Sequence, residues 1–158
     1  MKPPFEAIVS EHGRTVLRVC RAVVGIVDAD DAWSDTFLSA LEAYPRLPEN
    51  ANIEAWLVTI AHRKAIDITR RAASRAAPVE ALPSDTAVNG QERDLDLVRS
   101  VAALPERQRC AVVYHYIAGL PYSEIAAIVG GTAAAARRAA ADGVATLRKV
   151  RNDSTQGH

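Results

Sequence analysis

The sequence predicts an all-α protein made of two small helical domains joined by a flexible linker. Of its 158 residues, 49% are hydrophobic and 5% are aromatic, and this alanine-rich composition suits packed helices better than a β-sandwich. Apolar residues recur at helical spacing on both sides of a stretch of small and polar residues that has no periodicity. We therefore expect a domain at residues 1–73, a linker at 74–92, a second domain at 93–152 and a tail at 153–158.

The first domain is expected to hold three helices. The first covers Phe5–Val27, with Gly13 as its weak point. Asp28 can cap the second helix, because a carboxylate accepts hydrogen bonds from the N–H groups at a helix start, and Pro45 ends that helix. Asn52 can cap the third helix in the same way. Apolar stripes predict the buried faces of the second and third helices: Trp33, Phe37, Ala40, Leu41 and Tyr44, then Ile53, Trp56, Leu57, Ile60 and Ala61.

The second domain is expected to contain a helix-turn-helix. Two helices come first, and apolar residues define them: Leu97, Val98, Val101 and Leu104, then Cys110, Val113, Ile117 and Leu120. Pro105 suits the start of the second of these. Tyr122–Val129 is a two-turn helix, Gly130-Gly131 is a tight turn, and Thr132 can cap a last helix that runs to about Val150. A short helix, a glycine turn and a longer helix with arginines are the parts of a helix-turn-helix.

Composition excludes several classes of protein. The 19 basic residues balance 19 acidic ones, so bulk charge indicates nucleic-acid binding only weakly. Cys20 and Cys110 lie in apolar helical patterns and are interpreted as buried thiols of a reducing compartment. The 4 histidines show no metal-ligand spacing, and we find no signal peptide, membrane-spanning run, catalytic triad or phosphate-binding glycine loop. We expect a cytoplasmic protein that is not an enzyme and needs no metal or cofactor.

Three segments of the chain match a known family pattern. Asp28–Leu38 is acidic and ends in Thr-Phe-Leu, Trp56–Arg71 joins a Trp-Leu pair to basic residues, and Leu104–Arg109 precedes Gly119–Ala126. In this order they resemble the extracytoplasmic-function sigma factors, small bacterial transcription initiation factors of the sigma-70 family. The resemblance implies that the first segment docks on the polymerase clamp helices. It implies that the second reads the minus-ten promoter element and helps to open the duplex, and that the third begins the domain for the minus-thirty-five element.

Polymerase binding falls on the second helix by this resemblance. The residues that it implicates are Asp30, Asp31, Asp35, Thr36 and Leu38. Acidic residues also favour helix starts without any partner, because the helix dipole is positive there. Trp33 stands where the family usually has an aliphatic residue, and Ser34 stands where it usually has Gln, so the details of docking differ.

The third helix carries a basic face that is the expected minus-ten interface. Polar side chains recur along it at helical spacing: His62, Arg63, Lys64, Asp67, Arg70 and Arg71. Such a face neutralises phosphates and positions DNA without specifying its sequence. The alternative is a solvated helix face with no ligand. The loop at residues 46–52 could line pockets for exposed bases, whereas Trp56 is interpreted as a core residue because it lies on the apolar stripe.

The last helix departs from the family. Ala133–Ala136 stand where the family presents side chains to the major groove, and alanine cannot make the bidentate hydrogen bonds that distinguish base pairs. Farther along the last helix, Asp142 would repel phosphate and Gly143 costs the helix about 1 kcal/mol relative to alanine. In front of the Tyr122–Val129 helix, Pro121 stands where the family usually has a capping serine. The remaining DNA-binding candidates of this domain are Thr132, Arg137 and Arg138.

Three functions remain open. The first is a working sigma factor that binds core RNA polymerase and directs it to specific promoters. The second is a sigma-like helix-turn-helix regulator with weakened minus-thirty-five recognition, which acts through polymerase or anti-sigma binding. The third is an ordinary repressor or activator, which the Trp56–Arg71 helix and the absence of an evident dimerisation surface argue against. We expect the first, with core RNA polymerase, promoter DNA and an anti-sigma factor as partners, as a monomer when free and with no membrane insertion.

Overall fold

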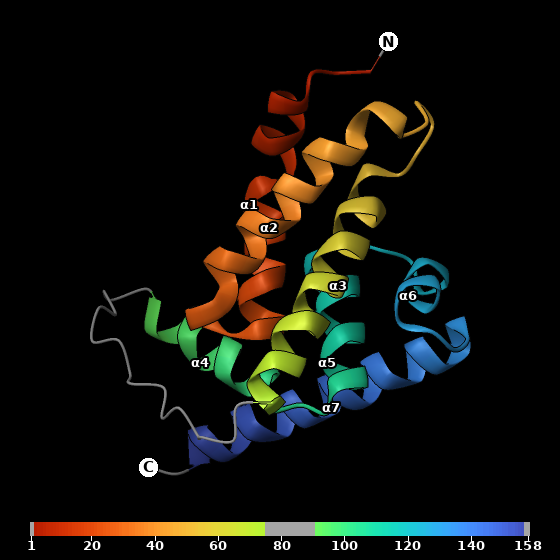
Figure 1. Ribbon diagram of the computed structural model, residues 1–158. Helices are drawn as coiled ribbons and strands as arrows, with labels where there is room; N and C mark the ends of the chain where they lie inside the picture. The colour runs from red at the N-terminus through yellow and green to blue at the C-terminus, as the bar shows by residue number, and fades with distance from the viewer. Residues whose placement is uncertain (1, 75–90, 157–158) are drawn as a thin grey trace.

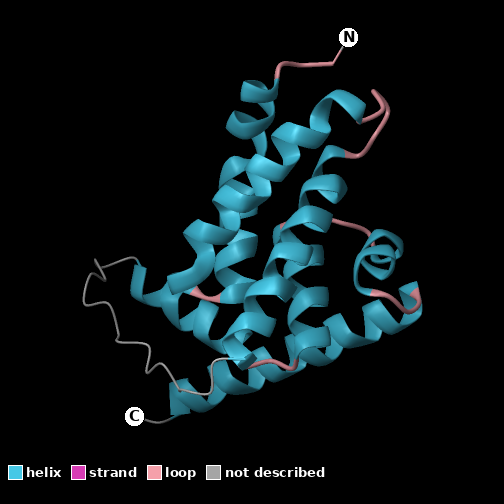
Figure 2. Ribbon diagram, in the orientation of Figure 1, coloured by secondary structure: helices cyan, strands magenta, loops and turns pink. Residues whose placement is uncertain are grey.

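The computed structural model describes residues 2–74, the first half, and residues 91–156, the second half. These residues form helices and short loops, with no strand in either described range (Figure 2). The predicted all-α class is therefore confirmed. Most of the predicted linker at 74–92 lies outside the described residues.

The first half folds as an antiparallel bundle of α1 (Phe5–Val24), α2 (Ile26–Ala43) and α3 (Ile53–Ser74), which lie side by side (Figure 1). Gly25 separates α1 from α2 with a φ of 87°, in the left-handed region that favours glycine. The prediction that the first helix continues to Val27 is therefore wrong. Asp28 lies within the first turn of α2 and does not cap it, because Gly25 already ends α1 three positions before Asp28.

Gly13 is a packing position and not a weak point of α1. It is buried, and the indole Nε1 of Trp33 donates a hydrogen bond of 2.8 Å to its carbonyl oxygen. A Cβ added at Gly13 would lie 3.5 Å from Cζ2 of Trp33. The small residue thus allows the Trp33 ring of α2 to lie directly on the backbone of α1.

Large apolar side chains fill the space between α1, α2 and the start of α3. The buried residues of this core include Ile8, Val16, Phe37, Tyr44 and Leu57. Leu41, which we predicted to be buried, is 52% exposed, because it lies about 100° around the helix from the buried Ala40. A 3-10 turn, η1 (Tyr44–Arg46), follows α2. The predicted cap of α3 is confirmed, since Oδ1 of Asn52 accepts a hydrogen bond of 3.1 Å from the N–H of Ala55.

The second half contains α4 (Gln91–Ala102), α5 (Glu106–Val112), a π-helical turn η2 (Val113–Ile117), α6 (Tyr122–Val129) and α7 (Ala133–Gln156). Helix α7 packs on α5 and α6 and crosses below the bundle (Figure 1). The helix-turn-helix is formed by α6, a glycine turn and α7, as predicted. The π-helical turn was not predicted, because the apolar spacing of α5 continues through it.

Two glycines and a threonine build the turn before α7. Gly130 and Gly131 have φ values of 91° and 90°, and Oγ1 of Thr132 accepts a hydrogen bond of 3.0 Å from the N–H of Ala135. The predicted turn and cap are therefore confirmed. The helix continues to Gln156, so the predicted end at Val150 is wrong and the predicted tail begins inside the helix.

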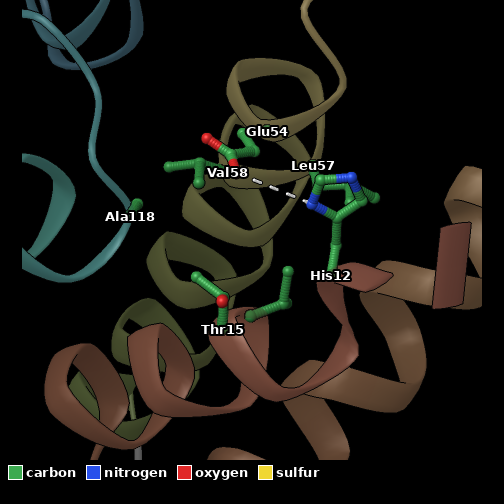
Figure 3. Close-up of a pocket in the computed structure, with 7 residues that line it drawn as sticks. His12, Thr15, Glu54, Leu57, Val58 and Ala118 are labelled. Atoms are coloured by element: carbon green, nitrogen blue, oxygen red, sulfur yellow. Dashed lines mark ion pairs between the residues drawn. The ribbon is translucent and has the colours of Figure 1, made fainter. Parts of the chain in front are cut away.

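The two halves share one buried cluster. The first half contributes Val19, Ala22, Ala55 and Val58, and the second half contributes Val101, Cys110, Val113, Tyr114, Ala118, Leu120, Ile125 and Ala136. The hydroxyl of Tyr114, a member of this cluster on η2, lies 2.7 Å from Nδ1 of His62 on α3. Figure 3 shows the edge of this contact, where Ala118 faces α3 across a hollow beside His12. The described residues thus pack as one unit.

Both cysteines are buried and unpaired, as the sequence predicts. Burial raises the pKa of Cys20 to about 12 and raises that of Cys110 as well. Both thiols therefore stay protonated near neutral pH.

Candidate DNA and polymerase interfaces

A surface pocket of about 450 Å³ lies between α2 and α3. Six side chains of α3 line it at helical spacing: Trp56, Thr59, Ile60, Arg63, Lys64 and Asp67. Ser39 and Ala43 of α2 line the opposite side of the pocket. Because their side chains are small, they do not fill the space between the two helices. The structure therefore brings three predicted DNA-binding residues, Arg63, Lys64 and Asp67, around a partly apolar wall.

The chemistry of this pocket fits an unstacked nucleotide. Trp56 is half-buried and packs on Tyr44 with a centroid separation of 6.2 Å, so it is a core residue as predicted and a pocket wall as well. Its indole and the side chain of Ile60 offer an apolar surface to a base, on which aromatic rings stack. Arg63 and Lys64 offer donors to phosphate, and the carboxylate of Asp67 accepts hydrogen bonds from base amino groups.

Arg70 and Arg71 do not line the pocket. They are exposed farther along α3 and extend the basic face toward the end of the helix. His62 does not belong to this face, contrary to our prediction, because it is only 8% exposed and points toward Tyr114. Burial lowers the pKa of His62, while the carboxylate of Glu106 opposes the shift. This histidine therefore serves the contact between the halves in its neutral form.

An exposed face of α2 carries the predicted polymerase contacts. Asp31, Asp35 and Leu38 are exposed at spacings of four and three residues, so they share one face of the helix. Leu38 is 61% exposed, and Leu41 continues the same face. Asp30 is also exposed, one position from Asp31 and therefore on the flank of this face.

Thr36 is a correction to the predicted polymerase site. Its side chain is fully buried, and its hydroxyl donates a hydrogen bond of 2.7 Å to the carbonyl oxygen of Ala32. The residue lies on the core face of α2, opposite the exposed face. It therefore supports the helix from inside and cannot touch a partner.

The start of α7 presents a mixed surface. Ala133, Ala134 and Ala135 are exposed, as are Arg137 and Arg138, whereas Ala136 faces the core. Asp142 is exposed one turn later. The structure therefore places both predicted arginines of this helix at its surface, and it places Thr132 at the cap.

Gly143 has a packing role that the sequence did not reveal. It is buried where α7 crosses α5, and an added Cβ would lie 2.7 Å from Cγ2 of Val112 and 3.4 Å from the carbonyl oxygen of Gln108. Glycine lowers the helix propensity of α7 at this position, but it is the residue that lets α7 cross α5 this closely.

Two further observations concern a metal site and a second hollow in the described ranges. These ranges contain no group of three or more potential metal ligands. The hollow in Figure 3, where Nδ1 of His12 lies 3.8 Å from Oε1 of Glu54, has a volume of about 10 Å³, which is at the lower limit for one water molecule. Among the described helices, none is both long and apolar enough to cross a bilayer.

Two family models match the chain: sigma-70 region 2 over residues 8–75 and sigma-70 region 4 over residues 94–147. The ECF RNA polymerase sigma factor SigC of Mycobacterium tuberculosis is 29% identical over 132 residues, which cover 80% of this chain and 71% of that protein. SigD of the same species is 34% identical over 137 residues, covering 77% and 65%. The sigma factor CarQ of Myxococcus xanthus is 28% identical over 156 residues, covering 92% and 88%.

A solved structure supports the same grouping at the level of the fold. CnrH, in its complex with the cytosolic domain of CnrY, matches with a TM-score of 0.73 at 21% identity, covering 94% of this chain and 88% of that one. The matches to regions 2 and 4 favour a working sigma factor over the two alternative regulators. The chain belongs to the sigma-70 family as an extracytoplasmic-function sigma factor, which directs RNA polymerase to promoters.

Proposed function

We propose that the α2–α3 pocket holds an unpaired base of the minus-ten element while the basic side chains beside it bind the flanking phosphates. The observation that carries this proposal is the grouping of Arg63, Lys64 and Asp67 around Trp56 and Ile60 in one pocket. A base that leaves the duplex needs a stacking surface to replace its neighbours. The pocket supplies this surface together with donors and an acceptor.

The exposed α2 face docks on core polymerase in this proposal. Asp31 and Asp35 offer negative charge, and Leu38 and Leu41 offer apolar area beside it. An acidic and apolar helix face complements a partner helix that is basic and apolar. An anti-sigma protein would silence the chain by covering the same face, because two partners cannot occupy it together.

Region 4 binds the upstream promoter element through α7. The helix-turn-helix presents the start of its second helix to the major groove, where Arg137 and Arg138 are exposed. We assign the protein a place in the cytoplasm, where it meets polymerase and DNA, and a binding role without catalysis.

The experiment that tests the proposal is run-off transcription with purified core polymerase on a library of promoter fragments. The variant Arg63→Gln/Lys64→Gln/Arg71→Gln should open promoters poorly and reduce the salt slope of promoter binding by about two to three. The matched control is Arg14→Gln/Arg18→Gln/Arg21→Gln, which removes three exposed charges from α1. Equal loss in both variants, or no loss in the first, would contradict the assignment of the α3 face.

A further inference from the structure

Three side chains of the second half form a continuous stack on its surface. The ring of Tyr122 lies parallel to that of His115, with a centroid separation of 4.1 Å and an interplanar angle of 15°. The guanidinium of Arg137 lies 5.5 Å from the centroid of the Tyr122 ring. The other end is fixed by Nδ1 of His115, which lies 2.9 Å from the carbonyl oxygen of Leu120.

The stack joins three elements that are separate in the sequence. His115 belongs to η2, Tyr122 is the first residue of α6, and Arg137 lies in the second turn of α7. A cation over an aromatic face is attracted by the negative charge of the ring. Arg137 is therefore held toward the start of α6 rather than extended along α7.

The neighbouring arginine has a different direction. The core side of α7 is marked by the buried Ala136 and Ala140. At about 100° per residue, Arg138 lies about 200° from Ala136 and points away from the core, whereas Arg137 lies on the flank beside α6. In a helix-turn-helix the outward face of the second helix meets base edges, and the first helix crosses the DNA backbone.

We propose that Tyr122 is a positioning residue that holds Arg137 against the DNA backbone, which leaves Arg138 as the arginine that reads a base edge. This inference rests on the proposed function of α7 and assigns a phosphate contact to one of its two arginines and a base contact to the other. His115 acts as the support that keeps the Tyr122 ring in place. No base readout is assigned to Arg137, because its guanidinium is committed to the ring of α6.

The test uses full-length protein bound to core polymerase, on promoter fragments with every base of the upstream element varied. Arg137→Ala should weaken binding about eightfold at 0.1 M salt for all fragments and lower the salt slope by about one, as expected for one lost phosphate contact. Tyr122→Leu should weaken it two- to fivefold, again for all fragments, since an exposed cation–ring contact is of that strength. Arg138→Ala should instead flatten the preference at one base position.

The control is Tyr122→Phe, which keeps the ring and should bind within about twofold of the wild type. In an Arg137→Ala background, Tyr122→Leu should have no further effect, because its action passes through the arginine. If Tyr122→Leu weakens binding equally in both backgrounds, or if Arg137→Ala changes base preference, the positioning role is wrong while α7 still binds DNA. If both arginine variants bind as the wild type does, the proposed function of α7 itself fails, and the inference fails with it.

Discussion

Nδ1 of His62 and the hydroxyl of Tyr114 lie 2.7 Å apart in the buried contact between the two halves of the protein. Their rings also meet edge to face, with an interplanar angle of 83°. Tyr114 is fully buried and His62 nearly so, so water cannot replace either partner. The stability of the two halves is therefore coupled at this point.

Tyr114→Phe should destabilise both halves together. The substitution keeps the ring but leaves the buried nitrogen of His62 without a partner, which costs about 1–3 kcal/mol. Urea unfolding can be followed by fluorescence of Trp33 and Trp56, which are the 2 tryptophans of the chain and belong to the first half, and by circular dichroism of all helices. We expect both transitions to shift by the same amount. The 60% exposed Tyr116 provides the control Tyr116→Phe, and a fluorescence transition that stays in place would contradict the coupling.

Stability should fall on acidification through His62. Burial lowers the pKa of this histidine below 6.5, so the unfolded chain binds its proton more readily than the folded protein does. This contribution is fully present above pH 6.5 and is lost as the pH falls through the lowered pKa of the folded state. His62→Gln cannot titrate and keeps an acceptor for Tyr114, so its free energy of unfolding should fall less steeply between pH 7 and pH 5. Parallel slopes for the two proteins would argue against this role.

Gly143→Ala should destabilise the protein although alanine is the better helix former. The new methyl group would meet Cγ2 of Val112 at 2.7 Å, and such overpacking costs about 1–3 kcal/mol. The gain in helix propensity is only about 1 kcal/mol. Thermal unfolding should show a lower melting temperature, and adding Val112→Ala should recover part of the loss by making room. A melting temperature above that of the wild type would mean that α7 can move away from α5 at no cost.

Asp31→Ala/Asp35→Ala should weaken the complex with core polymerase. If each carboxylate forms one exposed ion pair with the polymerase, each pair contributes up to about 1 kcal/mol, so the dissociation constant should rise by up to about thirtyfold, and the effect should shrink at high salt. Size-exclusion chromatography and a titration with labelled protein measure it. Helicity should stay unchanged, and Glu6→Ala/Glu11→Ala on α1 is the control with equal charge. A larger loss in the control would place the docking face elsewhere.

Residue types within a few positions predict much of the fold. The bounds of α6 and the caps by Asn52 and Thr132 follow from local hydrogen-bonding capacity. The break at Gly25 was missed because the apolar period of α1 passes directly into that of α2. The burial of Thr36 and the exposure of Leu41 depend on where α1 and α3 lie against α2, which no local pattern contains.

The residues of the candidate site also fall into those that local spacing predicts and those that depend on tertiary packing. Arg63, Lys64 and Asp67 follow from spacing on one helix, and the structure brings them together. Ser39 and Ala43 were missed because they come from another helix and carry no chemistry of their own. His62 has the spacing of the basic face, but its burial is set by Tyr114, more than fifty residues later.

The π-helical turn η2 places a constraint on chain length. Its backbone closes with a hydrogen bond from the N–H of Ala118 to the carbonyl oxygen of Val113, 3.1 Å long, which encloses one residue more than an α-helical turn does. Tyr114 and His115 are successive in this turn, yet one reaches His62 of the first half and the other supports Tyr122 of α6. Deleting one residue here would rotate α6 and α7 by about 100° relative to α5 and break one of these contacts. The side chain at position 116 is 60% exposed and its ring meets that of His115 edge to face, but the spacing of the turn depends on the presence of this residue and not on its side chain.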